Sequence, residues 1–339
     1  MTSFPVRPRS AAENGRRRVG WRAQWARRPP GAELWIGASL ALVYVGAALS
    51  ALVVYWGSWG TIATNPAWVP PFHPIGPSWA HPFGVVSGLG ADVFRAVWQA
   101  TPWDLAIVLA ILAIDATLAL SFGVVAGLSE GGWADALITF VSDSIGAIPS
   151  FFLVVAVYAG LTLLDPSQGN LPLFIALFGL LLWPTGARTV RERARVVAHE
   201  PYVEAARASG AGTAHLAYWH VLPNSVSPVL AQLPVDVAPI FFVLAVFPWF
   251  YNCGGGYLVP STLGPDYFIP HLAPASPLPS VAFPEWGNLL AIGTCAGFSF
   301  PGGADYWWMY LFPLLAIVGL GLTISLLCDG IDQWRRLSV

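Results

Sequence analysis

The chain has 339 residues, of which 56% are hydrophobic and 10% are charged, and its formal net charge at pH 7 is −2. A soluble globular domain carries about a quarter of its residues as charged side chains, so this composition argues against an ordinary soluble enzyme and against an intrinsically disordered chain. It predicts a protein that crosses the lipid bilayer several times.

Six apolar stretches are long enough to cross the hydrocarbon core as helices, which need about 20 residues each. The fourth is interrupted at its inner end by Pro184, Thr185 and Gly186, and tryptophans flank several of the six, as indole rings do at a membrane interface. We therefore expect an all-α membrane protein with six transmembrane helices, at about Leu34–Trp56, Leu105–Leu128, Ala136–Leu164, Leu171–Val190, Val226–Phe250 and Trp307–Cys328.

The arginine positions predict the orientation of these spans. All 16 basic residues are arginines, and 15 of them lie before the first span, after the fourth or after the sixth. Six spans place these regions on one side, which the excess of arginine identifies as the cytoplasm. Residues 1–33 are expected to form an Arg-rich cytoplasmic leader, and residues 34–339 a six-span domain with both termini cytoplasmic. A cleaved signal peptide is the alternative for the first span, but the apolar stretch is long for a signal core.

Two long outer segments, residues 57–104 and 251–304, are rich in proline and contain several aromatic residues. This composition predicts packed loops without regular structure. Cys253 and Cys295 both lie in the second loop, where they could form a disulfide in an oxidising compartment or remain two buried thiols. Cys328, at the inner face, is expected to stay free. Three cysteines are too few for a disulfide scaffold or a four-cysteine zinc site, and no metal site is expected.

The cytoplasmic loop of residues 188–223 contains the signals of a short helix. Pro201 suits the first helical turn, and Glu204 and Arg207 complement the dipole at the two ends. Gly210 suits the left-handed stop that follows a helix. Several alanines keep this helix thin enough to enter a groove on another protein, although packing on its own bundle is the alternative.

This loop resembles the EAA loop of ABC importer permeases, through Glu204-Ala205-Ala206, Gly210 and Leu222-Pro223. His220 is similar to the histidine of the dipeptide, oligopeptide and nickel branch. Further motifs match in an order and spacing that most resemble those of the C-type of the two permease subunits. The resemblance covers about residues 34–336. Those matches are His81-Pro82-Phe83-Gly84, Gly90-Ala91-Asp92-Val93, Gly131-Gly132-Trp133, Pro149-Ser150 and Pro284-Glu285-Trp286-Gly287-Asn288-Leu289-Leu290.

The resemblance implies a non-catalytic transporter subunit in a prokaryotic cytoplasmic (inner) membrane. Its implied partners are a second, different permease subunit, two ATP-binding subunits and an extracytoplasmic solute-binding protein, with no nucleic acid. ATP and Mg²⁺ would be bound by the partners, since this chain has no GxxxxGK[ST] motif. Peptides are the expected substrate, with a nickel chelate or another small solute as the alternative. The implied ATPase-docking residues are Tyr202, Glu204, Ala205, Ala206, Gly210, Leu222 and Pro223.

The chain departs from the family pattern on its translocation side. Ala91 replaces the arginine of the family's GRDV motif, and Leu244 stands where the family has a glutamate near the end of the fifth span. The outer loop at about 257–283 is also longer than usual. These departures leave the coupling residues intact and bear on the substrate.

Acidic residues inside spans are functional candidates, because burying a carboxylate in the membrane is costly. Asp115, Asp143 and Asp236 could line the pore or hydrogen-bond neighbouring helices. They could also form the proton path of a proton-coupled secondary transporter, but that alternative leaves the EAA loop unexplained.

The histidines do not support an enzyme. His81 precedes a proline in a family motif and is expected to be structural. His215 and His220 lie five residues apart and are not expected to share a helix face well; we interpret them as interface or structural residues. No HExxH motif and no Ser-His-Asp arrangement can be inferred, so a membrane hydrolase is disfavoured.

Overall fold

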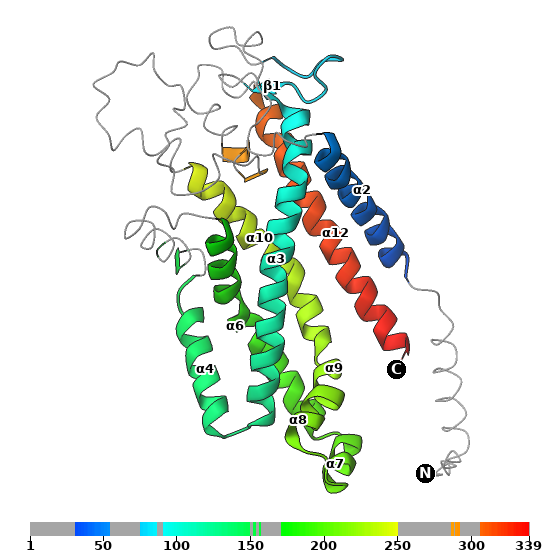
Figure 1. The fold of residues 1–339 in the computed structure, drawn as a ribbon, viewed down its shortest axis with the longest axis vertical. Coiled ribbons are helices and arrows are strands. Elements are labelled where there is room, and N and C mark those ends of the chain that lie inside the picture. Colours follow the sequence, from blue (N-terminus) through cyan, green and yellow to red (C-terminus); the bar gives the residue numbers. More distant parts are fainter. Residues whose placement is uncertain are drawn as a thin grey trace, which may run out of the picture.

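The computed structural model describes residues 31–54, 75–86, 91–149, 152–153, 156, 171–249, 286–287, 289–291 and 306–338. These residues form an elongated bundle in which the long helices run roughly side by side (Figure 1). Within them, four helices are long and apolar enough to cross a membrane, and they correspond to the first, second, fifth and sixth expected spans. They are α2 (Ala32–Val54), α3 (Val93–Leu128), α10 (Val226–Trp249) and α12 (Trp308–Ser338).

Two further helices lie in the regions of the third and fourth expected spans. They are α4 (Trp133–Gly146) and α6 (Leu171–Ala198). Helix α6 continues through Pro184, where the sequence suggested an interruption. Most of the third expected span beyond residue 149 lies outside the described residues.

Three helix boundaries correct the sequence analysis. Helix α3 begins at Val93, so residues 93–104, expected in an outer loop, are helical; Asp92 caps this helix by accepting the N–H of Arg95 at 3.0 Å. Helix α6 runs beyond the expected end at Val190, and α12 runs beyond the expected end at Cys328. The extensions of α3 and α6 bury side chains against the bundle, such as Ala96 and Ala194, which favours continued helix there.

A short pair of strands precedes α3, while the other elements of the described residues are helices, in agreement with the expected all-α class. Strands β1 (Val85–Val86) and β2 (Ala91–Asp92) pair antiparallel, with Val85 opposite Asp92. His81 Nδ1 lies 2.8 Å from Asp92 Oδ2, the carboxylate that caps α3. The expected structural role of His81 is thus confirmed: it fastens its loop to the start of α3.

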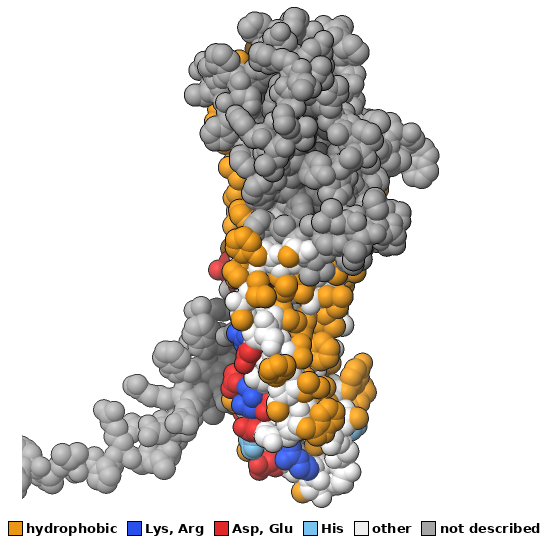
Figure 2. All heavy atoms as spheres, turned by 90° about the vertical axis from the view of Figure 1, so that its left-hand side faces the viewer, with side chains coloured by type: hydrophobic (Ala, Val, Ile, Leu, Met, Phe, Trp, Pro, Cys, Tyr) orange, Lys and Arg blue, Asp and Glu red, His pale blue; other side chains and the backbone are white. Residues whose placement is uncertain are grey.

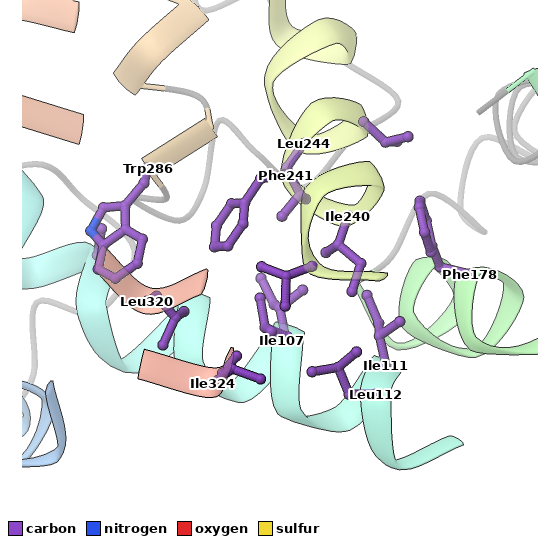
Figure 3. Packing of buried hydrophobic residues seen from close by; sticks show 14 of the residues in the cluster. Ile107, Ile111, Leu112, Phe178, Ile240, Phe241, Leu244, Trp286, Leu320 and Ile324 are labelled. Atoms are coloured by element: carbon purple, nitrogen blue, oxygen red, sulfur yellow. The ribbon is translucent and has the colours of Figure 1, made fainter. Parts of the chain in front are cut away.

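The main hydrophobic core lies between α3, α6, α10 and α12 (Figure 3). Ile111 of α3, Phe178 of α6 and Ile240 of α10 are fully buried there, and Leu320 contributes from α12. Helix α3 lies at the centre of this arrangement and packs against each of the other long helices.

Helices α3 and α6 approach closely because glycines line α3 at their contact. A Cβ atom on Gly123 would lie 2.6 Å from side-chain atoms of Val190, and one on Gly127 would lie 2.6 Å from Cβ of Ala194. Small residues at such contacts are typical of helices that pack within membranes.

The described surface changes in chemistry along the bundle. Figure 2 shows apolar side chains over the middle of one face and charged side chains gathered toward the end that carries α7 (Pro201–Ala208). We call this end the α7 end. The apolar side chains exposed on α2 and α12, such as Leu42, Val53 and Val318, fit a surface in contact with lipid.

Candidate functional site

Helix α7 has the boundaries that the sequence predicts. Pro201 occupies the first turn, Glu204 lies early and Arg207 lies in the last turn. Gly210 has a φ of +90° and donates its N–H to the carbonyl of Arg207 at 3.0 Å, which closes the helix. The result is a short helix at the tip of the bundle (Figure 1).

One residue anchors α7 to the bundle. Val203 is completely buried and packs in a cluster with Val197 of α6 and with Leu216 and Val221 of the return segment. The sequence analysis did not single out Val203, although a lone valine among polar and alanine positions is a signal for such an anchor. This cluster therefore connects α7 to α6 and to the segment that leads into α10.

The residues implied to dock a partner divide into two groups. Tyr202, Glu204, Ala205, Gly210 and Pro223 lie on the surface of the chain. Ala206 and Leu222 are half-buried and pack against the cluster around Val203. The exposed group is accessible on the surface of this chain, and the half-buried group holds that surface against the bundle.

The return from α7 into the membrane contains a π-helical turn. Helix α8 (Thr213–Leu216) continues into η3 (Ala217–Val221) and α9 (Leu222–Asn224), and α10 follows. The rings of His215 and His220 lie 5.8 Å apart, centroid to centroid. The expectation that these histidines do not share a helix face well is therefore wrong, because the widened π turn brings side chains five residues apart closer together.

An aromatic surface surrounds the two histidines. The ring of Tyr202 lies 6.1 Å from that of His220, and the ring of Trp219 lies 6.4 Å from that of His215. Tyr218 and Trp219 are well exposed. Desolvation and then the nearby carboxylate of Glu200 raise the pKa of Tyr202, so its hydroxyl stays protonated at neutral pH. The α7 end thus presents aromatic rings beside an acidic residue, Glu204.

Behind α7, Asp135 at the start of α4 binds two arginines of α6, and the sequence analysis missed it. Its carboxylate accepts hydrogen bonds from Arg191 Nε at 2.5 Å and Nη2 at 3.0 Å, and from Arg195 Nη2 at 2.8 Å. The N–H of Gly131 donates to the same carboxylate. The hydrogen bonds from Arg191 are the main reason that the pKa of Asp135 is lowered to about 2. This cluster ties the turn between α3 and α4 to the α6 segment that carries α7.

Replacing Asp135 with asparagine should destabilise the chain by roughly 2–3 kcal/mol, between the values typical of exposed and of buried ion pairs. Because the folded pKa is depressed, the contribution of the carboxylate is present above its unfolded pKa of about 4 and is lost as the pH falls toward 2. Thermal unfolding in detergent should show a gap between wild type and variant that is full at pH 7 and narrows below about pH 4.

Asp143→Asn is the matched control for that experiment, because Asp143 pairs with Arg188 at 3.0 Å in an exposed position. It should change stability by less than about 1 kcal/mol. Two results would contradict a specific role for the Asp135 cluster. One is an equal loss of stability in the two variants, and the other is a stability difference between wild type and Asp135→Asn that does not depend on pH.

The acidic residues expected in the membrane lie in different environments. Asp143 is exposed and paired with Arg188, whereas Asp115 of α3 and Asp236 of α10 are 2% and 5% exposed. Gln232 donates to Asp236 Oδ1 at 3.0 Å, whereas Asp115 Oδ1 and Asp236 Oδ2 are buried and have no hydrogen-bond partner among the described residues.

The remaining sequence candidates are the cysteines. Cys253 and Cys295 lie outside the described residues. Cys328 is buried in α12 as a free thiol, in agreement with the sequence analysis.

At the opposite end of the bundle, Trp286 fastens a short helical segment to α3. Its backbone N–H donates to Asp104 Oδ2 at 3.0 Å, and its indole Nε1 donates to the carbonyl of Val97 at 2.9 Å. Its ring lies 6.0 Å from those of Tyr44 and Phe241. Asp104 is fully buried and was not predicted as a functional residue, since its partner lies 182 residues further along the chain.

Comparison with known proteins identifies a family and several relatives that this chain resembles. The model of the family described as binding-protein-dependent transport system inner membrane component matches residues 119–336. The chain is 31% identical over 255 residues to the probable D,D-dipeptide transport system permease protein DdpC of Escherichia coli, covering 75% of this chain and 72% of the relative.

Two further relatives match with similar identity and coverage. A glutathione transport system permease protein, GsiD, of Pectobacterium atrosepticum is 30% identical over 256 residues, covering 76% of this chain and 72% of the relative. A dipeptide transport system permease protein, DppC, of Alkalihalophilus pseudofirmus is 30% identical over 260 residues, covering 76% of this chain and 71% of the relative.

Proposed function

The chain belongs to the family of binding-protein-dependent transport system inner membrane components, and from this premise we propose that it is the permease subunit of an ATP-driven importer of peptides. The proposed substrate class rests on the three relatives, which are named as permeases for dipeptides or for glutathione, a small peptide. A nickel chelate, the alternative substrate, has no counterpart among these three relatives.

The proposed topology has six spans with the α7 end in the cytoplasm. Helices α2, α3, α10 and α12 are long and apolar enough to supply four spans. Helices α4 and α6, with the chain between them, would supply the other two. The orientation rests on the arginines, 15 of which would then lie on the cytoplasmic side with both termini.

In the proposed mechanism α7 is a coupling helix that sits in a cleft of an ATP-binding subunit. Its exposed surface, formed by Tyr202, Glu204 and Ala205, would contact that subunit. Closure of the ATPases on ATP would push α7, and the buried contact of Val203 would carry the displacement to α6 and α10. A packed cluster shifts as a unit between discrete arrangements, which suits rigid-body transmission.

The partners follow from this mechanism. Two ATP-binding subunits would hydrolyse ATP with Mg²⁺, and a second, different permease subunit would complete the pore. A solute-binding protein would deliver peptide at the end opposite α7. This chain would contribute no catalytic residue of its own.

The pair of Asp115 and Asp236 would act inside the bundle, where it joins α3 to α10. Since these helices must move relative to each other during alternating access, the pair would be strained or exposed in another state and could then face the pore. The same pair is the feature on which the alternative of a proton-coupled transporter rests.

Uptake into proteoliposomes would test the proposed function. The chain should be reconstituted with the subunits that co-purify from native membranes, and supplied with a labelled dipeptide and its binding protein. We expect uptake that requires ATP and continues when a protonophore collapses the proton gradient. Asp115→Asn and Asp236→Asn should each retain ATP dependence, because in the proposed function the energy comes from the ATP-binding subunits and not from these carboxyl groups.

The outcomes of that experiment separate the two functions. Uptake that needs a proton gradient but no ATP would replace the proposed function with proton-coupled transport. If both asparagine variants and the corresponding alanine variants took up peptide at the wild-type rate, the pair would have no role in transport.

A further inference from the structure

Helices α4 and α6 lie side by side (Figure 1) and share a polar contact in the region proposed to span the membrane. Arg188 of α6 donates from Nη2 to the carbonyl of Ser142 at 3.1 Å, and the same nitrogen lies 3.0 Å from Asp143 Oδ1 of α4. Ser142 donates from its hydroxyl to the carbonyl of Pro184 at 3.2 Å. Asp143 lies about 12 Å further along α4 than Asp135, at 1.5 Å per helical residue. The contact is therefore deeper in the bundle than the Asp135 cluster.

The guanidinium group of Arg188 fits against α4 because residue 146 is a glycine. A Cβ atom on Gly146 would lie 2.6 Å from Arg188 Nη2, so a larger residue would displace the arginine. Both charged side chains nevertheless remain accessible, that of Arg188 by 49% and that of Asp143 by 61%. An ion pair this exposed contributes little to stability, so a ligand with charges of its own can separate it at small cost.

The exposed face of α6 around Arg188 is polar. Thr185, Arg188 and Thr189 follow one another at helical spacing and all are exposed, and Glu192 extends the row by one turn. The exposed face of α4 is apolar by contrast and includes Phe140, which is 70% exposed. Lipid chains offer no hydrogen bonds, so the α4 face suits lipid, whereas the polar row on α6 requires water or protein beside it.

We propose that Asp143 and Arg188 line the translocation pathway and bind the two charged ends of a transported peptide. A peptide with free ends carries an ammonium group and a carboxylate at neutral pH. The ammonium group would bind Asp143, and the carboxylate would bind Arg188, whose planar guanidinium group suits carboxylate oxygens. Charged residues at membrane depth are typical of substrate pathways. The inference rests on the proposed function and on the proposed topology, in which α4 and α6 supply two spans.

Labelling of an introduced cysteine would test whether the polar row faces an aqueous pathway. Thr189→Cys and, as the matched control, Phe140→Cys should be treated in inside-out vesicles that contain the whole complex, with a membrane-impermeant methanethiosulfonate reagent. The modified residue is located by mass spectrometry of the digested chain. We expect Thr189→Cys to react at least about tenfold faster, because a thiol in apolar surroundings seldom ionises. If the two variants reacted equally slowly, lipid or the second permease subunit would cover the row, and the proposal would be overturned.

Uptake by the reconstituted complex would test the contact with peptide. The measurement uses a labelled dipeptide and a saturating concentration of its loaded binding protein, so that the rate reports steps after docking. We expect Asp143→Asn and Arg188→Gln each to lower the peptide taken up per ATP hydrolysed roughly fivefold, since each removes a charge-assisted hydrogen bond. Glu130→Gln is the matched control, because Glu130 is 54% exposed and lies 3.7 Å from Arg195, in the turn between α3 and α4. It should leave this ratio unchanged.

A double variant separates binding of peptide from simple ion pairing. Asp143→Asn with Arg188→Gln should transport less than either single variant, because each residue binds a different end of the peptide. Recovery of the wild-type ratio in the double variant would show that the two residues matter only to each other, and it would overturn the proposal, as would unchanged transport in both single variants. A wild-type complex that takes up no peptide with ATP would instead reject the proposed function, so the two failures are distinguishable.

Discussion

Replacing Gly210 with tryptophan is expected to abolish the recovery of ATP-binding subunits with this chain and to lower ATP-driven peptide uptake at least tenfold. Gly210 has a φ of +90°, and no atom of the described residues lies within 4 Å of the place a Cβ would occupy. The Cβ position is therefore open among the described residues, so we expect the bulky side chain to obstruct a docked partner and not the chain itself. Overpacking a contact costs about 1–3 kcal/mol, which is about one to two orders of magnitude in affinity.

The control for Gly210→Trp must carry the same backbone strain at another place. Gly131 offers this, because it has a φ of +70° and likewise no described atom within 4 Å of its Cβ position. A non-glycine residue at either position bears about 1–2 kcal/mol of left-handed strain. We expect Gly131→Trp to retain the ATP-binding subunits, measured by affinity purification through a C-terminal tag. Full recovery of those subunits with Gly210→Trp would reject docking through α7.

The sequence predicted α7 well because its signals are local. Pro201, Glu204, Arg207 and Gly210 each act within one turn of the helix they define, and the structure places the ends of α7 accordingly. The long apolar helices were also predictable, since span length follows from the thickness of the bilayer.

The boundaries that failed depend on packing between distant segments. Pro102 favours a loop by local criteria, yet α3 continues through it because Ala96 and Ala100 are buried against the bundle. The extension of α6 beyond Val190 is likewise stabilised by the burial of Ala194. Tertiary contacts of this kind outweigh local propensity and cannot be read from neighbouring residues.

The candidate site was predictable only in part for the same reason. Glu204 and its neighbours were found through spacing, but the Asp135 cluster joins residues 56 and 60 positions apart. The contact between His215 and His220 requires a π turn, which is rare and has no reliable sequence signal. The pairing of Asp115 with Asp236 likewise depends on how α3 and α10 are placed side by side.

Replacing Trp286 with alanine should destabilise the chain by about 3–5 kcal/mol, as is usual for a buried tryptophan. Trp286 is 1% exposed, and removing it would leave a cavity among α3, α10 and α12. The indole bond to the carbonyl of Val97 would also be lost. The midpoint of thermal unfolding in detergent measures this loss. Trp79→Ala is the control, because Trp79 is fully exposed and its removal should change stability by less than about 0.5 kcal/mol.

A second variant separates packing from hydrogen bonding at this position. Trp286→Phe keeps an aromatic ring near Phe241 but removes the indole donor, so we expect a smaller loss, about 1–2 kcal/mol. Asp104 would still accept the backbone N–H in both variants, because that bond does not involve the side chain of residue 286. If Trp286→Ala and Trp286→Phe were equally destabilising, the bond to Val97 would be the main contribution of this tryptophan. If Trp286→Ala melted like Trp79→Ala, the segment around Trp286 would not be anchored to α3 at all.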